Sequence, residues 1–182
     1  GKYYLHLFDV TQADLNWENP ELRNDIYKMI NFWLEKGVDG FRLDVINLIS
    51  KNQRFPDDNY KTPTSDGRKF YTDGPKIHEF LQELTANTFG KYPESLTVGE
   101  MSSTSISHCV EYTKPENREL SMVFNFHHLK VDYPNGEKWA LGELDFKALK
   151  DIFFKWQVGI ENGDGWSAVF WCNHDQPRIV SR

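Results

Sequence analysis

Four short β-prone runs alternate with stretches that have the apolar spacing of amphipathic helices, and this order constrains the fold more than any other feature. The spacing, with its capping signals, predicts helices over about residues 20–36, from Pro75 onward, over 106–112 and after Asp145. The expected strands are residues 38–46, 95–101, 121–126 and 166–173. Such alternation predicts an α/β fold in which right-handed crossovers build a parallel sheet with its helices outside.

The length of the chain limits how this sheet can close. A closed (β/α)8 barrel typically needs about 250 residues, whereas the chain has 182. With about four consecutive βα units, we expect either a smaller open sheet or a partial barrel. The sequence starts at Gly1 without a Met, and we expect it to be a piece of a longer protein.

Charge and cysteine content exclude several classes of protein. The formal net charge is −6, and without a run of Lys or Arg the chain lacks the positive surface that phosphate backbones or anionic lipids require. No apolar stretch approaches the length of about 18 residues typical of a membrane span. Cys109 and Cys172 have no metal-ligand spacing, so we expect neither a zinc site nor a disulfide framework. Nucleic-acid and membrane partners are therefore not expected.

Three of the four expected strands end in a carboxylate: Asp44, Glu100 and Asp175. In parallel α/β folds ligands gather at the carboxyl ends of the strands, so these three side chains define a candidate site. Each could instead cap the following helix or lie on the surface. As a group they could also bind Mg²⁺ or Mn²⁺. Paired carboxyl groups are, in addition, what glycoside hydrolysis requires.

The neighbours of two of these residues suggest separate roles. Arg42 lies two residues before Asp44 on the same strand and points to the same face, and its guanidinium favours the ionised carboxylate that a nucleophile needs. Crowding by another carboxylate should raise the pKa of Glu100, as a general acid requires. Asp175 can then hold sugar hydroxyl groups.

Three segments resemble, in order and spacing, signature motifs of the alpha-amylase family of retaining glycoside hydrolases. They are Gly40-Phe41-Arg42-Leu43-Asp44-Val45-Ile46-Asn47, Thr97-Val98-Gly99-Glu100-Met101 and Asn173-His174-Asp175-Gln176-Pro177-Arg178. A fourth segment, Gln12 to Trp17, is similar to the one by which the inserted domain of that family returns to the barrel, although Ala13 stands where Pro is usual.

The resemblance implies that the chain contains strands four to seven of a (β/α)8 barrel, with residues 1–18 as the return segment from the inserted domain. It implies Asp44 as nucleophile, Glu100 as acid/base and Asp175 as transition-state stabiliser, with Arg42 and His174 contacting substrate. The other barrel strands and the C-terminal β-domain of the family are missing from these residues. We therefore expect the isolated chain to be inactive and its exposed barrel edges to favour self-association.

Finer similarities concern the substrate. Val45 after the expected nucleophile is similar to the branch of the family that includes both oligo-1,6-glucosidases and enzymes acting on trehalose 6-phosphate. The stretch from Ser121 to Tyr133, with Phe170-Trp171-Cys172, more closely resembles the members that hydrolyse trehalose 6-phosphate to glucose and glucose 6-phosphate. Lys130 could contact the 6-phosphate, with His127 or His128, because a cation there suits a phosphorylated sugar. The alternative for Lys130 is a solvated surface lysine.

Three further expectations follow from this resemblance. The reaction should need no cofactor or metal, and a phosphorylated substrate would place the enzyme in the cytoplasm. An oligo-1,6-glucosidase or other α-glucosidase acting on neutral sugars is the alternative with the same chemistry. A non-catalytic relative that only binds a partner is a further alternative, although all three carboxylates are present.

Overall fold

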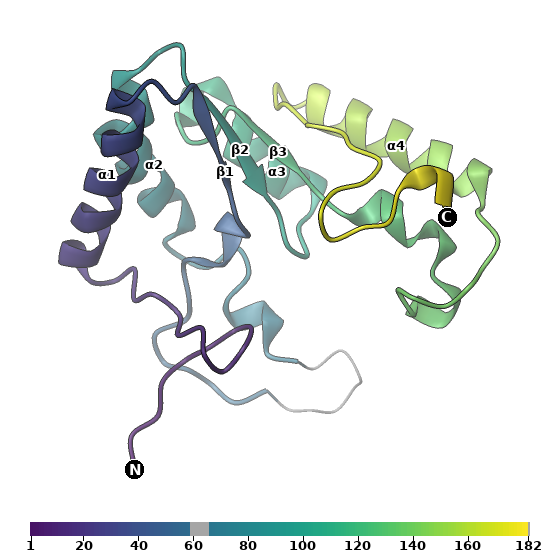
Figure 1. Cartoon of the computed structure of the whole chain (residues 1–182), viewed down its shortest axis with the longest axis horizontal. Helices are drawn as coiled ribbons and strands as arrows, with labels where there is room; N and C mark the ends of the chain where they lie inside the picture. The colour runs from purple at the N-terminus through teal and green to yellow at the C-terminus, as the bar shows by residue number, and fades with distance from the viewer. Residues whose placement is uncertain (59–65, 182) are drawn as a thin grey trace.

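The structure, a computed structural model, describes residues 1–58 and 66–181, and three parallel strands form its sheet (Figure 1). In sheet order the strands are β1 (Gly40–Leu43), β2 (Leu96–Glu100) and β3 (Met122–Phe124). Helix α1 (Pro20–Glu35) precedes β1, and the three strands are followed in turn by α2 (Ile77–Asn87), α3 (Ile106–Thr113) and α4 (Phe146–Glu161). The predicted α/β class and parallel sheet are confirmed.

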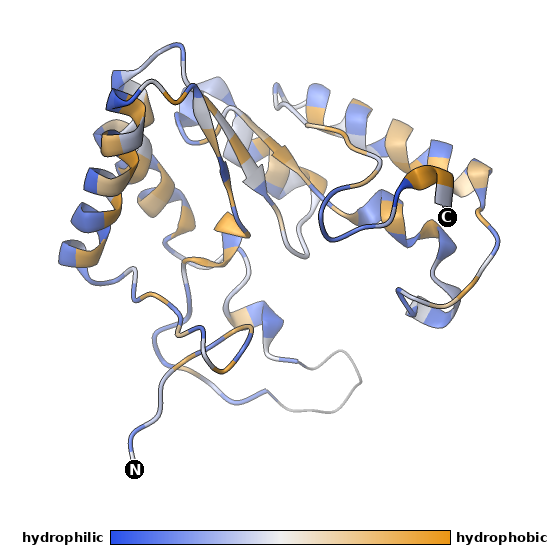
Figure 2. Cartoon of the chain, viewed as in Figure 1, coloured by the Kyte–Doolittle hydropathy of each residue, from blue (hydrophilic) through white to orange (hydrophobic). Residues whose placement is uncertain are grey.

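The helices begin where the sequence places capping residues. The side chain of Asn19 accepts a hydrogen bond from the backbone N–H of Glu21 at 3.0 Å, and Asp145 accepts one from Ala148 at 2.9 Å. Each bond satisfies an N–H group that has no partner within the helix. Hydrophilic and hydrophobic residues alternate along α1, α2 and α4, as expected for amphipathic helices (Figure 2).

The predicted fourth strand, residues 166–173, is wrong for the described part of the chain. Only Ser167 forms a β-bridge there, with Val123 of β3, and the remainder is irregular. Its apolar residues made it β-prone, but β-propensity reflects how well a side chain fits a half-buried pleated surface. Here Trp166 and Val169 are more than half exposed. The described chain therefore has three βα units rather than four.

The core lies between the sheet and the helices. Its fully buried side chains include Leu81 of α2, Tyr112 of α3, Val123 of β3 and Ile160 of α4. Helices α1 and α2 lie side by side near β1, while α4 packs against α3 near the other end of the sheet (Figure 1). This packing fixes the strands and leaves their carboxyl ends directed toward the loops and the N-terminal segment.

Candidate active site

Strand pairing brings the first two carboxylates together. The last pair of the β1–β2 ladder is Leu43 with Gly99, so the next residue of each strand, Asp44 and Glu100, stands at the same edge of the sheet. Just beyond, Val45 turns the chain sharply with φ +35°, a left-handed conformation that is unusual for a β-branched residue. Asp44 thus lies at the start of a tight turn, with its side chain largely exposed.

One guanidinium group connects these two carboxylates. Nη1 of Arg42 lies 2.7 Å from Oδ1 of Asp44, and Nη2 contacts Oε2 of Glu100. The guanidinium also lies over the ring of Phe124 of β3, 5.7 Å from its centre. Arg42 therefore holds side chains from all three strands in one cluster, with both carboxyl groups within reach of the same cation.

The environment of Glu100 favours its protonated form. Its side chain is only 6% exposed, and burial is the largest effect that raises its pKa above the ordinary range. Arg42 opposes this change, whereas Asp44 and Asp175 raise the pKa further. The predicted rise in the pKa of Glu100 is confirmed, but its main cause is burial rather than the nearby carboxylates. A carboxyl group whose pKa is raised in this way is suited to act as a general acid.

The third carboxylate, Asp175, comes from an irregular segment rather than a strand end. Its side chain is 57% exposed and lies 3.3 Å from Nε2 of His174, and its backbone N–H donates to the side chain of Asn173 at 2.9 Å. Asp175 is close enough to influence the pKa of Glu100. Arg42 therefore brings Asp44 and Glu100 together, while Asp175, with His174 beside it, is linked to this pair through its electrostatic effect on Glu100.

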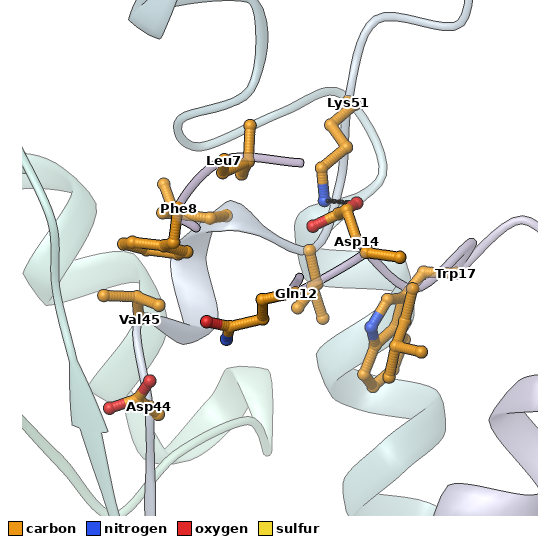
Figure 3. Close-up of a pocket in the computed structure, with 12 residues that line it drawn as sticks. Leu7, Phe8, Gln12, Asp14, Trp17, Asp44, Val45 and Lys51 are labelled. Atoms are coloured by element: carbon orange, nitrogen blue, oxygen red, sulfur yellow. Dashed lines mark ion pairs between the residues drawn. The ribbon is translucent and has the colours of Figure 1, made fainter. Parts of the chain in front are cut away.

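An open pocket of about 200 Å³ extends from Asp44 to the N-terminal segment. Figure 3 shows Asp44 and Val45 on one side of it, and an ion pair between Lys51 and Asp14 on the other. The Lys51 ammonium lies 2.7 Å from Asp14, and both side chains are mostly buried. The pocket offers space for a ligand beside the exposed Asp44 carboxylate. The ion pair between Lys51 and Asp14 joins residues that are far apart in the chain, and no sequence motif predicts it.

Lys130, His127 and His128 lie in a short 3₁₀ segment after β3, His127–Asp132. The Lys130 side chain is exposed, and its charge helps to lower the pKa of His127 to about 4, although burial is the larger cause. The ring of His127 packs on Trp156 of α4 at 4.4 Å between centres. Nε2 of His128 lies 2.8 Å from the carbonyl oxygen of Phe170. Of the three, Lys130 is the one that presents a positive charge to solvent.

Sequence reasoning did not single out a buried group behind the carboxylates. Asn47, three residues after Asp44, is completely buried and hydrogen-bonds both Asp73 and the backbone of Ser102. The sequence feature that could have identified Asn47 is its place as a polar residue within the apolar run from Val45 to Ile49, because buried polar groups need hydrogen-bond partners.

Within 1–58 and 66–181, no three His, Cys, Asp or Glu side chains are arranged to hold a metal ion. Over the same residues, no helix is long and apolar enough to cross a bilayer.

The fold and the cluster of carboxylates agree with the result of a family comparison. Residues 1–182 match the family described as "Alpha amylase, catalytic domain", and the chain belongs to this family.

Similarity to individual proteins shows which members of this family the chain resembles. The chain is 65% identical over its full length to the trehalose-6-phosphate hydrolase of Bacillus subtilis (strain 168). It is 47% identical to an oligo-1,6-glucosidase of Parageobacillus thermoglucosidasius, over all of its length. The crystal structure of a Bacillus licheniformis trehalose-6-phosphate hydrolase mutant in complex with PNG superimposes over the whole chain with a TM-score of 0.94 and 66% identity. In each case the chain spans 32% of the relative's length.

Proposed function

We propose that this chain is part of an enzyme that hydrolyses an α-glucosidic bond with retention of configuration. The observation that supports this most strongly is the shared contact of Arg42 with Asp44 and Glu100, since a retaining glycosidase needs two carboxyl groups close to one another. The buried Glu100 and the exposed Asp44 are in different environments, as an acid and a nucleophile require.

In this mechanism each carboxyl group has one role. Glu100 protonates the glycosidic oxygen while Asp44 attacks the anomeric carbon, which breaks the bond and leaves a glucosyl group covalently attached to Asp44. Glu100, now ionised, removes a proton from water, and the resulting attack releases the sugar and regenerates both groups. Asp175 stabilises the positive charge of the transition state, while Arg42 and His174 contact the substrate.

We propose trehalose 6-phosphate as the substrate, with glucose and glucose 6-phosphate as products. The support is the 65% identity to a trehalose-6-phosphate hydrolase, against 47% to an oligo-1,6-glucosidase. The exposed Lys130 is the proposed phosphate contact, with His127 and His128 as its neighbours. A phosphorylated sugar as substrate places the proposed enzyme in the cytoplasm.

The substrate is tested by comparing the hydrolysis of trehalose 6-phosphate and isomaltose by the complete enzyme at equal concentration. We expect a strong preference for the phosphorylated sugar, and Lys130→Ala should reduce that preference. Lys147→Ala is the matched control, because Lys147 is an exposed lysine of α4 paired with Asp151. A preference for isomaltose would favour the oligo-1,6-glucosidase function instead. Equal losses on both sugars in Lys130→Ala would contradict the phosphate contact.

The place of the chain in a larger enzyme is also a proposal. β1, β2 and β3 would be strands four to six of a (β/α)8 barrel, and the segment that pairs at Ser167 would occupy the seventh position. Residues 1–18 would be the return segment from an inserted domain, and the missing parts would include a C-terminal β-domain. Measurable turnover by the isolated 182-residue chain would contradict the need for these parts.

The sheet also supports self-association of the isolated chain. Because β1 is an edge of the three-stranded sheet, its backbone is open to pairing with another copy. Elution of the isolated chain only as a monomer in size-exclusion chromatography would contradict this.

A further inference from the structure

A buried hydrogen-bond network joins the two chain segments that follow Asp44 and Glu100. At its centre the side chain of Asn47 is completely buried. Its Oδ1 accepts from the backbone N–H of Ser102 at 2.9 Å, and its Nδ2 donates to the carbonyl oxygen of Ser102 at 2.8 Å. The amide of Asn47 thereby binds one peptide segment at two points, much as a neighbouring strand would.

The contact between Asn47 and Ser102 lies just beyond the two carboxylates in the chain. Backbone pairing between β1 and β2 ends at Leu43 and Gly99, immediately before the two carboxylates. Asn47 is three residues after Asp44, and Ser102 is two residues after Glu100. Each carboxylate therefore lies between the end of the ladder and the Asn47–Ser102 contact. The separation of the two segments is therefore fixed on both sides of the carboxylates, by strand pairing before them and by the Asn47–Ser102 contact after them.

Asp73 anchors Asn47 from a third segment. Oδ1 of Asp73 accepts from Nδ2 of Asn47 at 3.0 Å, and the backbone N–H of Asp73 donates to the carbonyl oxygen of Asn47 at 2.9 Å. Two residues of helix α3 hold the same carboxylate: the hydroxyl group of Tyr112 donates to the same Oδ1 at 2.5 Å, and Nδ1 of His108 lies 2.9 Å from Oδ2. Asp73 therefore connects Asn47 to the rigid helix behind the site.

Unfavourable backbone conformations lie on all three segments. Val45, Asp73 and Ser103 have positive φ angles of 35°, 48° and 52°. Such conformations persist only where surrounding contacts determine the backbone, and they concentrate at sites where geometry matters for function. The Asn47 and Asp73 hydrogen bonds supply those contacts here.

We propose that Asn47 is a positioning residue that sets the placement of Glu100 relative to Asp44, with Asp73 and Tyr112 as its support. The inference rests on the proposed glycosidase function and deepens it. Asn47 touches neither the substrate nor the reacting atoms in this account. Its effect is on proton transfer, because an acid displaced from the glycosidic oxygen donates its proton poorly.

The test compares two substrates of the complete enzyme that differ only in their leaving group. One is the disaccharide that the wild type hydrolyses, and the other is the 4-nitrophenyl α-glucoside with the same glycone. A nitrophenolate leaves readily without protonation, whereas a sugar alkoxide needs the acid. In Asn47→Ala we expect kcat/KM for the disaccharide to fall by roughly tenfold or more relative to the aryl substrate.

Controls separate this effect from a loss of folded protein. A smaller folded fraction lowers both rates equally and leaves their ratio unchanged. Thr88→Val is matched for burial, since Thr88 is completely buried at the end of α2 and its hydroxyl donates to the carbonyl oxygen of Leu84 at 2.7 Å. That variant should keep the wild-type ratio.

Tyr112→Phe is the milder variant if Asn47→Ala does not fold. It removes only the hydroxyl group that supports Asp73, and it should change the ratio in the same direction by a smaller factor. An unchanged ratio in the folded variants would overturn the positioning role while the wild-type activity leaves the proposed function intact. Failure of the wild type to hydrolyse either substrate would overturn the proposed function itself.

Discussion

Arg42 is the cation shared by two carboxyl groups, so its replacement tests how the site controls the protonation of Glu100. Burial and the charges of Asp44 and Asp175 raise the pKa of Glu100, and Arg42 is the opposing influence. The Arg42→Gln variant of the complete enzyme keeps a polar side chain but removes that charge. The pKa of Glu100 should therefore rise further.

The size of this change follows from the contact geometry. A cation within about 4–6 Å lowers the pKa of a carboxyl group by about 1–3 pH units, and Arg42 contacts Glu100 directly. The Arg42 side chain is 37% exposed, so water screens part of its charge. We therefore expect the lower end of that range, about one pH unit, which corresponds to about 1.4 kcal/mol.

The pH dependence of kcat/KM measures this change, because its basic limb reports the acid of the free enzyme. We expect this limb to move to higher pH by about one unit in Arg42→Gln, with a lower maximum. Arg23→Gln is the control, since Arg23 pairs with Glu83 between α1 and α2, and its basic limb should match the wild type. A basic limb that stays in place or moves to lower pH in Arg42→Gln would refute the reasoning.

Two predictions concern stability. Glu119 raises the pKa of His78 through a contact of 2.9 Å, so this pair stabilises the fold fully below about pH 6.5 and less as the pH rises through the higher pKa of the folded state. In urea unfolding of the complete enzyme, the stability lost in His78→Gln should be smaller at pH 9 than at pH 6, and an equal loss at both would contradict this. Leu81→Ala should lower the free energy of unfolding by about 2–5 kcal/mol, because Leu81 is completely buried. Leu141→Ala, at a fully exposed residue, should change it little, and similar losses in both variants would argue against this core.

The features that local sequence patterns determine could be predicted. The Asn19 cap and apolar spacing predicted both ends of α1 within one residue, and the Asp145 cap predicted the start of α4, because capping and amphipathicity are properties of neighbouring residues. Helix α2 begins at Ile77, two residues after Pro75. The meeting of Asp44 and Glu100 could be predicted from the common direction of parallel strands, whereas Asp175 lies on an irregular segment.

Contacts between distant residues could not be predicted in the same way. Asn47 and Asp73 are 26 residues apart, and neither periodicity nor spacing pairs them. The burial of Glu100 depends on packing around β2, which only the folded chain reveals. The predicted strand at 166–173 failed because β-propensity does not specify pairing partners, and in the described residues only Ser167 pairs with β3.

Trapping the covalent intermediate is a direct test of the proposed double displacement by Asp44 and Glu100. The complete enzyme would be treated with a fluorinated α-glucosyl fluoride whose glucosyl-enzyme hydrolyses slowly, and its peptides analysed by mass spectrometry. We expect one fluoroglucosyl group on Asp44, no label in Asp44→Asn, and the α-anomer as the first product of hydrolysis by the wild type. An unlabelled Asp44 with the β-anomer released first would contradict it.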